Sequence, residues 1–289
     1  MLRSLLFVPG DSERKLATAS GMEADALILD LEDAVAQPRK QSARDTVTNF
    51  LRSRTGDRRQ ALWVRINALN TEHARHDLTA IVRAQPDGIV LPKANSPEQV
   101  AELAQQLDKL EKDAGIPAGQ IGIIPVATET AGAVFQLGAY GQEMPRLRAL
   151  TWGAEDLSLA IGAAGSRDDE GNLLPVFQQV QAMVLLAAGA AGVPAIETIY
   201  AQFDDPDGLR KVIFQGRRQG FTGMLAIHPS QVPVINAAFA PTTDEIEQAR
   251  RVVEAFANSN GAGAIRLDGK MLDQPHLDQA QRLLKRRGT

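Results

Sequence analysis

Two carboxylates, Glu129 and Asp156, each follow a short apolar run of the kind that forms a buried strand. Glu129 closes the run IGIIPVATET, and Asp156 closes RALTWGAED. Parallel barrels collect their chemistry at the carboxyl ends of strands, so we expect both side chains to face one site. Mg²⁺ prefers carboxylate oxygens and fills its remaining positions with water and substrate oxygens. The pair therefore indicates a divalent metal site, with helix capping as the structural alternative.

Three cationic residues also lie at strand ends or just beyond them. Arg65 ends the run in WVRINAL, and its planar fork suits a substrate carboxylate. Arg14 follows FVPGDSER and could bind carboxylate or phosphate, or simply be solvated. Lys93 ends GIVLPK and is expected to bind phosphate or to pair with nearby carboxylates. A Schiff base on Lys93, as in a pyruvate aldolase, would need a depressed pKa, which nothing nearby in the sequence predicts.

The segment DLEDAV places Asp30, Glu32 and Asp33 within four residues. Carboxylates this close repel one another unless a positive charge lies among them, which a hydrated metal, Arg14 or Arg65 would supply. We expect Glu32 and Asp33 to support or bind the substrate. The alternative is that Asp33 caps a turn and Glu32 pairs with an arginine.

The elements that must position these residues are short apolar runs alternating with segments of helical period. Such nearly continuous runs are typical of parallel strands covered on both faces. The runs are Leu2–Pro9, Ala26–Leu31, Leu62–Asn67, Gly88–Pro92, Ile121–Ala127, Arg148–Trp152, Val193–Ile199 and Gly223–His228.

Eight strand and helix pairs predict an α/β fold, a (β/α)8 TIM barrel over residues 1–240. Residues 241–289 form a predicted C-terminal extension, either a lid or an arm onto a neighbouring subunit. It should contain a helix at Thr243–Ser259, a short strand at Ala264–Leu267 and a final helix after Pro275. A doubly wound open sheet is the alternative, but no G-x-G-x-x-G follows the first run.

Composition limits the classes of protein that the chain can be. It has 289 residues, 44% of them apolar, and a net charge of −4, which gives no reason to expect nucleic-acid binding. The absence of cysteine excludes disulfides, thiolate metal sites and a cysteine nucleophile. We expect a cytoplasmic enzyme, because no targeting signal or membrane span is evident.

Several motifs together resemble the citrate lyase β-subunit family, which includes malyl-CoA and citramalyl-CoA lyases and belongs to the HpcH/HpaI aldolase/citrate lyase superfamily. They occur in order through nearly the whole chain. They are LLFVPGDSERKLATA, LILDLEDAV, VRINAL, IVLPKA, ATETAGAV, TWGAEDLSLAIG, AIHPSQ and GKMLDQP. The resemblance implies a (β/α)8 barrel with Mg²⁺ at its C-terminal mouth, assembled as a homotrimer or a larger oligomer such as a hexamer.

The resemblance also implies roles for individual residues. Glu129 and Asp156 match the metal carboxylates, and Arg65 matches the substrate-binding arginine. Arg14 matches a second arginine near the acyl or coenzyme end. Asp273, in GKMLDQP, matches an acid–base aspartate that acts in its own subunit or in a neighbour's.

The activity implied is reversible cleavage of a 3-hydroxyacyl-CoA of the citryl, citramalyl or malyl type to acetyl-CoA and a 2-oxo acid. One alternative is a catalytic β subunit of a citrate lyase complex, with the thioester on an acyl carrier protein. Another is an inactive scaffold barrel. The sequence leaves open which acyl group is used and whether thioester hydrolysis follows cleavage.

Overall fold

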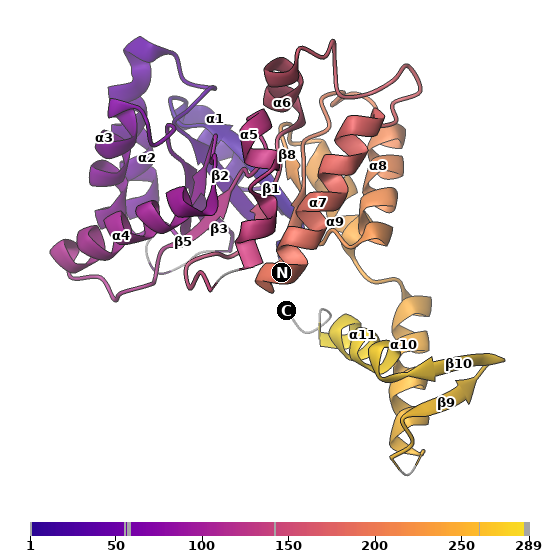
Figure 1. Ribbon diagram of the computed structural model, residues 1–289. Coiled ribbons are helices and arrows are strands. Elements are labelled where there is room, and N and C mark those ends of the chain that lie inside the picture. Colours follow the sequence, from indigo (N-terminus) through magenta and orange to yellow (C-terminus); the bar gives the residue numbers. More distant parts are fainter. Residues whose placement is uncertain (1, 55, 57–58, 142, 260, 286–289) are drawn as a thin grey trace. The chain divides into compact units, whose positions relative to one another are not determined.

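The computed structural model describes residues 2–54, 56, 59–141, 143–259 and 261–285. Two compact units make up the chain, Leu2–Asn236 and Ala237–Thr289. The first unit is built on eight parallel strands (Figure 1). These are β1 (Ser4–Pro9), β2 (Ala26–Asp30), β3 (Ala61–Arg65), β4 (Gly88–Leu91), β5 (Gly122–Pro125), β6 (Leu150–Thr151), β7 (Ala195–Glu197) and β8 (Gly223–Ala226).

The eight strands form a sheet that is nearly closed into a barrel. Hydrogen-bonded neighbours follow the order β5-β4-β3-β2-β1-β8-β7-β6. Isolated parallel bridges join Ile123 to Leu147 and Val126 to Thr151, so the β5 edge meets the β6 edge. The predicted TIM-barrel architecture is confirmed, and the doubly wound alternative is wrong.

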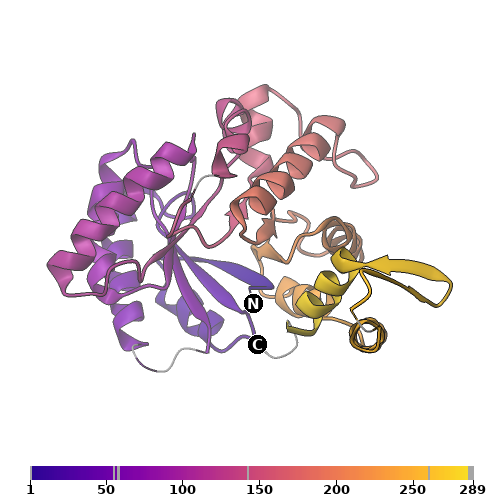
Figure 2. The same cartoon turned by 60° about the horizontal axis from the view of Figure 1, so that its bottom comes forward.

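Helices connect the strands and lie outside them. In Figure 1 the helices of the first half lie on one side of the barrel and α7 and α8 on the other, and Figure 2 shows the same strands from a second direction. The α-helices are α1 (Glu13–Ser20), α2 (Lys40–Ser53), α3 (Glu72–Ile81), α4 (Pro97–Ala114), α5 (Ala131–Val134), α6 (Ala154–Ile161), α7 (Pro175–Ala191), α8 (Pro206–Gln219) and α9 (Gln231–Phe239). Short 3₁₀ turns are η1 (Gln37–Arg39), η2 (Val82–Ala84) and η3 (Leu137–Gly141).

The interior of the barrel is filled by apolar side chains from most of the strands. Trp63 is the largest of them, and it fits because β4 begins with Gly88. A Cβ atom at Gly88 would lie 2.1 Å from Trp63 Cζ3, so any side chain there would displace the indole. The interior of the barrel is therefore a packed core.

The second unit has its own apolar core. It contains α10 (Thr243–Ala257), a hairpin of β9 (Ala264–Leu267) and β10 (Lys270–Asp273), and α11 (Gln274–Lys285), which lies against α10 in Figure 1. Thr242 and Glu245 form a capping box at the start of α10. The predicted strand at Ala264–Leu267 is present, but its partner β10, which ends at Asp273, was not predicted. The boundary predicted at residue 240 stays a prediction.

Candidate active site

A cavity of about 260 Å³ opens at the carboxyl ends of the barrel strands. Parallel strands deliver all their C-terminal residues to the same rim, so segments far apart in sequence meet there. The polar lining includes the three residues expected to bind metal and substrate carboxylate. They are Arg65, Glu129 and Asp156, which lie beside Asp30, Trp152, Glu155 and Thr198.

Arg65, the last residue of β3, is held by two acidic residues. Its Nε donates to Asp30 Oδ1 at 2.8 Å and its Nη2 donates to Asp30 Oδ2 at 2.6 Å. Its Nη1 lies 3.1 Å from Glu32 Oε2, and its guanidinium carbon lies 4.6 Å from the centre of the Phe7 ring. Burial works against the charge, but the hydrogen bonds to Asp30 and the charges of Asp30, Glu32 and Glu129 together keep the pKa of Arg65 above its usual value. The guanidinium is thus a fixed, fully charged fork.

The turn after β2 is organised by Asp30. Its carboxylate accepts hydrogen bonds from the main-chain N–H of Glu32 at 2.9 Å and of Ala34 at 3.2 Å. Asp30 and not Asp33 thus caps this turn, whereas the other half of the sequence-based alternative, an ion pair between Glu32 and an arginine, is present with Arg65. Glu32 is buried and turns inward, whereas Asp33 remains largely exposed. Burial raises the pKa of Glu32, and the positive charge of Arg65 opposes that rise.

Lys93, just beyond β4, contacts three of the acidic residues of the site. Its Nζ lies 2.5 Å from Glu32 Oε1, 3.3 Å from Asp33 Oδ2 and 3.6 Å from Asp156 Oδ1. Burial opposes the charge of Lys93, but the hydrogen bond to Glu32 and the surrounding carboxylates hold its pKa above the usual value. An amine that stays protonated is a poor nucleophile, so this geometry opposes the Schiff-base alternative. It agrees with the expected pairing of Lys93 with the DLED carboxylates.

Glu129 is buried at the rim and does not cap a helix. Its Oε2 accepts a hydrogen bond from the main-chain N–H of Lys93, whereas the N-cap of α5 is Thr130, whose Oγ accepts from Ala133 N at 3.2 Å. Burial is the main reason that the pKa of Glu129 is raised to about 8, while the Lys93 hydrogen bond works in the opposite direction. Gly153 leaves the space that this side chain occupies, because a Cβ there would lie 2.7 Å from Glu129 Cγ.

Asp156 is the third residue of α6, and one third of its side chain is exposed. It therefore reaches the cavity from the first turn of a helix whose N-cap is Gly153, and the N–H of Gly153 donates to Thr128 Oγ1 at 3.1 Å. Within the described part of the chain, no three acidic or histidine side chains converge on one metal position. Two carboxylates in one cavity nevertheless fit Mg²⁺, which keeps several water or substrate oxygens. Glu129 and Asp156 are the residues that would hold it.

Among the predicted site residues of the first unit, Arg14, Glu32, Asp33 and Lys93 are absent from the lining of this cavity, although Glu32 and Lys93 contact its lining residues Arg65 and Asp156. Arg14 is exposed on α1. Asp273 belongs to the second unit, at the end of β10. There its Oδ1 lies 2.5 Å from His276 Nδ1, a partner that the sequence analysis overlooked. The proposed roles of Arg14 in coenzyme binding and of Asp273 in proton transfer therefore rest on the resemblance.

Sequence reasoning also missed a buried carboxylate behind the cavity. Glu197, at the end of β7, accepts hydrogen bonds from Trp152 Nε1 at 2.6 Å and from Gln181 Nε2 at 2.6 Å. These bonds fix the plane of Trp152, which forms one wall of the cavity. A glutamate that ends an otherwise apolar run, PAIET, was a signal that could have found it.

The HpcH/HpaI aldolase/citrate lyase family matches residues 3–229. The chain belongs to this family. It is 34% identical to citrate lyase subunit beta of Haemophilus influenzae over 286 residues, which are 98% of this chain and 96% of that protein. It is equally similar, 34% over 284 residues, to (3S)-malyl-CoA thioesterase of Cereibacter sphaeroides, with 98% and 93% covered.

Solved structures of the family agree with the fold. A structure of the Mycobacterium tuberculosis protein CitE, in complex with magnesium, acetoacetate and coenzyme A, matches with a TM-score of 0.81 and 32% identity. The match covers 99% of this chain and 98% of that one. The expected citrate lyase β-like identity is confirmed, and family membership assigns the chain to the carbon–carbon lyases. Among the described helices, none has the length and apolar character needed to cross a bilayer.

Proposed function

We propose that the chain cleaves a 3-hydroxyacyl-CoA to acetyl-CoA and a 2-oxo acid, with Mg²⁺ held by Glu129 and Asp156. The observation that carries the proposal is that these two carboxylates and the fork of Arg65 line one cavity. A metal ion and a guanidinium side by side would grip an oxo acid through its carboxylate and adjacent oxygen. The magnesium and acetoacetate bound in the Mycobacterium tuberculosis relative support the same chemistry.

The chain's own residues would orient the substrate and move protons. Arg65 would hold the carboxylate of the 2-oxo acid portion, since Asp30 fixes the fork from behind. A base accepts the hydroxyl proton, the hydroxyl oxygen becomes the carbonyl oxygen of the 2-oxo acid, the C–C bond breaks, and its electron pair remains on the thioester fragment as an enolate. Asp273 would then deliver a proton to the enolate carbon, giving acetyl-CoA. Bound Mg²⁺ would supply positive charge next to the oxygens on which negative charge develops.

Lys93 and Arg14 complete the proposed substrate site. Lys93 neutralises the acidic group of Glu32, Asp33 and Asp156, so that the cavity can accept an anionic substrate. Arg14, exposed on α1, would contact the acyl or coenzyme portion of the thioester. We also propose that residues 241–289 act as a lid or as an arm onto a second subunit of a homo-oligomer, which would bring Asp273 to a cavity.

The deciding experiment is a panel of citryl-, citramalyl- and malyl-CoA assayed with Mg²⁺, with products identified by mass. Cleavage releases acetyl-CoA with oxaloacetate, pyruvate or glyoxylate respectively, whereas hydrolysis releases free CoA. The proposal is supported if a 2-oxo acid forms with Mg²⁺ present and no longer forms when EDTA removes the metal. Absence of cleavage for every thioester, with Mg²⁺ demonstrably bound, would contradict it.

A second candidate is the β subunit of a citrate lyase complex acting on an acyl carrier protein thioester. The similarity to citrate lyase subunit beta over 98% of the chain favours it. Activity on free acyl-CoA without any partner protein separates the two, because the second candidate predicts turnover only of the carrier-bound thioester. A scaffold without activity is disfavoured, since Arg65, Glu129 and Asp156 share one cavity.

A further inference from the structure

Lys40 is a buried cation that the proposed reaction does not use. It is the first residue of α2 and only 4% of its surface is exposed. A lysine is rarely buried so completely unless its charge is paired or fully hydrogen-bonded. It does not line the cavity, so neither metal nor substrate accounts for its position. Burial lowers the pKa of Lys40, and the charge of Asp77 is the strongest opposing influence.

All three protons of the Lys40 ammonium are used within the protein. Nζ donates to the main-chain oxygens of Leu31 and Glu32, each at 2.7 Å, and to Asn67 Oδ1 at 2.8 Å. Hydrogen bonds from a charged donor are roughly twice as strong as neutral ones. A lysine with no spare proton position and no cavity contact is neither a base nor a nucleophile for substrate. Its bonds instead hold the main chain of the turn that carries Glu32.

A second layer of buried polar groups holds this lysine in place. Asn67 Nδ2 donates to Leu31 O at 2.9 Å and to Asp77 Oδ2 at 2.7 Å. Asp77 Oδ1 in turn accepts from Arg44 Nη1 at 3.1 Å. The acceptors of Lys40 are thus anchored to α2 and α3, and the turn cannot shift without breaking several buried bonds.

The same turn is held from its other edge by Asp30, which accepts the N–H groups of Glu32 and Ala34. Lys40 donates hydrogen bonds to the main-chain carbonyls of this turn, and Asp30 accepts hydrogen bonds from its main-chain N–H groups, so both edges of the main chain are fixed. The fixed main chain directs the Glu32 side chain toward the two cations, and its carboxylate lies 2.5 Å from Lys93 Nζ and 3.1 Å from Arg65 Nη1.

We propose that Lys40 is a positioning residue that fixes the Leu31–Glu32 main chain and thereby aims Glu32 at Arg65 and Lys93. The expected effect of Lys40 on catalysis rests on the proposed function, whereas its effect on the turn does not. The structural part, that Lys40 rigidifies the turn, can be measured without any substrate.

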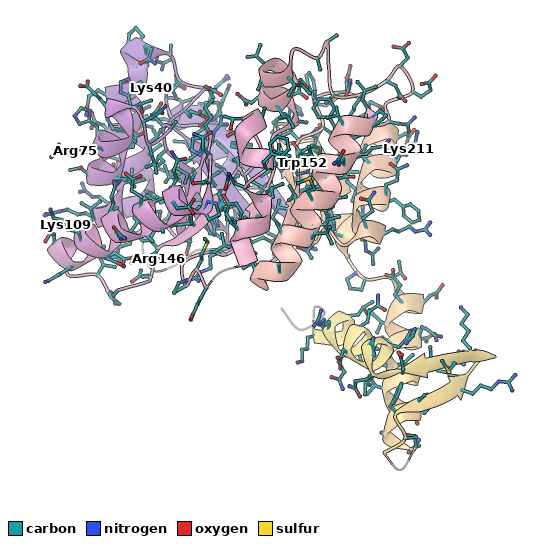
Figure 3. The ribbon with its side chains drawn as sticks, in the orientation of Figure 1. Lys40, Arg75, Lys109, Arg146, Trp152 and Lys211 are labelled. Carbon is teal, nitrogen blue, oxygen red and sulfur yellow. The ribbon has the colours of Figure 1, made fainter. Side chains whose placement is uncertain are left out.

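The test compares Lys40→Met with Lys109→Met. Lys109 is exposed on α4 and gives the same substitution on the surface of the barrel (Figure 3). We expect hydrogen exchange at the amides of Glu32 and Ala34 to accelerate at least tenfold in K40M and to stay unchanged in K109M. With an active thioester, kcat/KM should fall at least tenfold in K40M alone. If K40M does not fold, Lys40→Gln keeps a hydrogen-bond donor without the charge. It should show the same faster exchange and lower kcat/KM, by smaller factors.

A double variant separates positioning from general stabilisation. If Lys40 acts through Glu32, combining K40M with Glu32→Gln should lower kcat/KM by clearly less than the product of the two single effects. A lower melting temperature with unchanged exchange at Glu32 and Ala34, or fully multiplicative effects, would overturn the proposal. If the wild type cleaves no thioester but exchange still accelerates in K40M, the lyase proposal fails and the holding of the turn by Lys40 stands.

Discussion

The main-chain N–H of Lys93 donates a hydrogen bond to the carboxylate of Glu129, 36 positions further along the chain. Lys93 can present this N–H because its backbone is left-handed, with φ of +49°. That conformation costs an ordinary residue roughly 1–2 kcal/mol, and the surrounding structure must compensate for it. Since the Lys93 side chain reaches three other carboxylates, one residue organises four acidic groups of the site.

This left-handed backbone predicts an unusual order of stability for two variants. Lys93→Gly should be more stable than Lys93→Ala by about 1 kcal/mol, because glycine adopts positive φ without strain. At Lys109, an exposed position in the interior of helix α4, the order should be reversed, with Lys109→Ala more stable than Lys109→Gly by a similar amount. Urea unfolding of the four variants measures both differences. An Ala variant that is the more stable at both positions would show that residue 93 does not need its left-handed conformation.

Gly153 lies so close to Glu129 that a side chain at this position should disturb metal binding. Gly153→Ala should push Glu129 aside, since the new Cβ would lie 2.7 Å from Glu129 Cγ. We expect Mg²⁺ affinity to fall about tenfold or more, by analogy with the effect of disturbing the residues that orient a metal ligand. Calorimetric titration measures it. Gly189→Ala on α7, where a Cβ meets nothing within 4 Å, is the matched control and should bind Mg²⁺ normally.

The raised pKa of Glu129, about 8, predicts how Mg²⁺ binding depends on pH. Below that pH the metal-free carboxyl is protonated, so binding must release a proton, and affinity should rise by about tenfold per pH unit until it levels off near pH 8. The contribution of Glu129 to the folding stability of the metal-free protein should change with pH in the opposite direction. Its folded state binds the proton more tightly than the unfolded chain, so this group's contribution to stability falls as pH rises from about 4.5 to 8.

Titrations in two buffers of different ionisation enthalpy count the released proton directly. About one proton should be released near pH 6 and almost none above about pH 9. Glu129→Gln should weaken binding and remove this dependence. A wild-type affinity that does not change across this range would show that Glu129 is already ionised or is not a ligand.

Proton transfer is predicted to depend on Asp273 and not on the metal ligands. Asp273→Asn should lower kcat by roughly 10²–10⁴-fold, the usual contribution of a positioned acid–base group, while Mg²⁺ affinity stays unchanged. Asp278→Asn, at an exposed position of the following helix α11, is the control on the same unit. His276→Ala should lower kcat as well, because His276 Nδ1 lies 2.5 Å from Asp273 Oδ1 and helps to orient that carboxylate. Near-normal turnover in D273N would remove Asp273 from the mechanism.

The barrel was predictable because its strands are buried on both faces and read as apolar runs. Even β6, which is only two residues long, was found from the run RALTW. The strand β10 was missed because its side chains are exposed or half-buried and show no apolar run. The dipeptide Asp268-Gly269, with both residues at positive φ, is a strong hairpin signal and would have identified it.

The site was predictable where residues follow strands directly or within a few positions, as Asp156 does in the first turn of α6. Arg65, Lys93 and Glu129 were found by that rule, because the carboxyl ends of parallel strands share one rim. Lys40 was not, since its partners are main-chain oxygens of a turn, which leave no pattern in sequence. Arg14 follows a strand as well, but it lies on an exposed helix face and the rule alone could not reveal this.

Arg65→Lys tests whether the substrate is held by a fork or only by a positive charge. Lysine would keep the charge but offers a single ammonium, so the paired bonds to the two Asp30 oxygens cannot both form in their present geometry. Asp30 would then lose part of its hold on the cation while still accepting the N–H of Glu32 and of Ala34.

We expect kcat/KM of R65K to fall roughly 100-fold, because a misplaced carboxylate clamp spoils the alignment of the bond to be broken. Arg75→Lys, at an exposed position of α3, should have wild-type kinetics. Binding of a 2-oxo acid such as pyruvate, measured by calorimetry with Mg²⁺ present, should weaken in R65K in parallel. A loss of activity without weaker binding of the oxo acid would mean that Arg65 acts on the transition state alone.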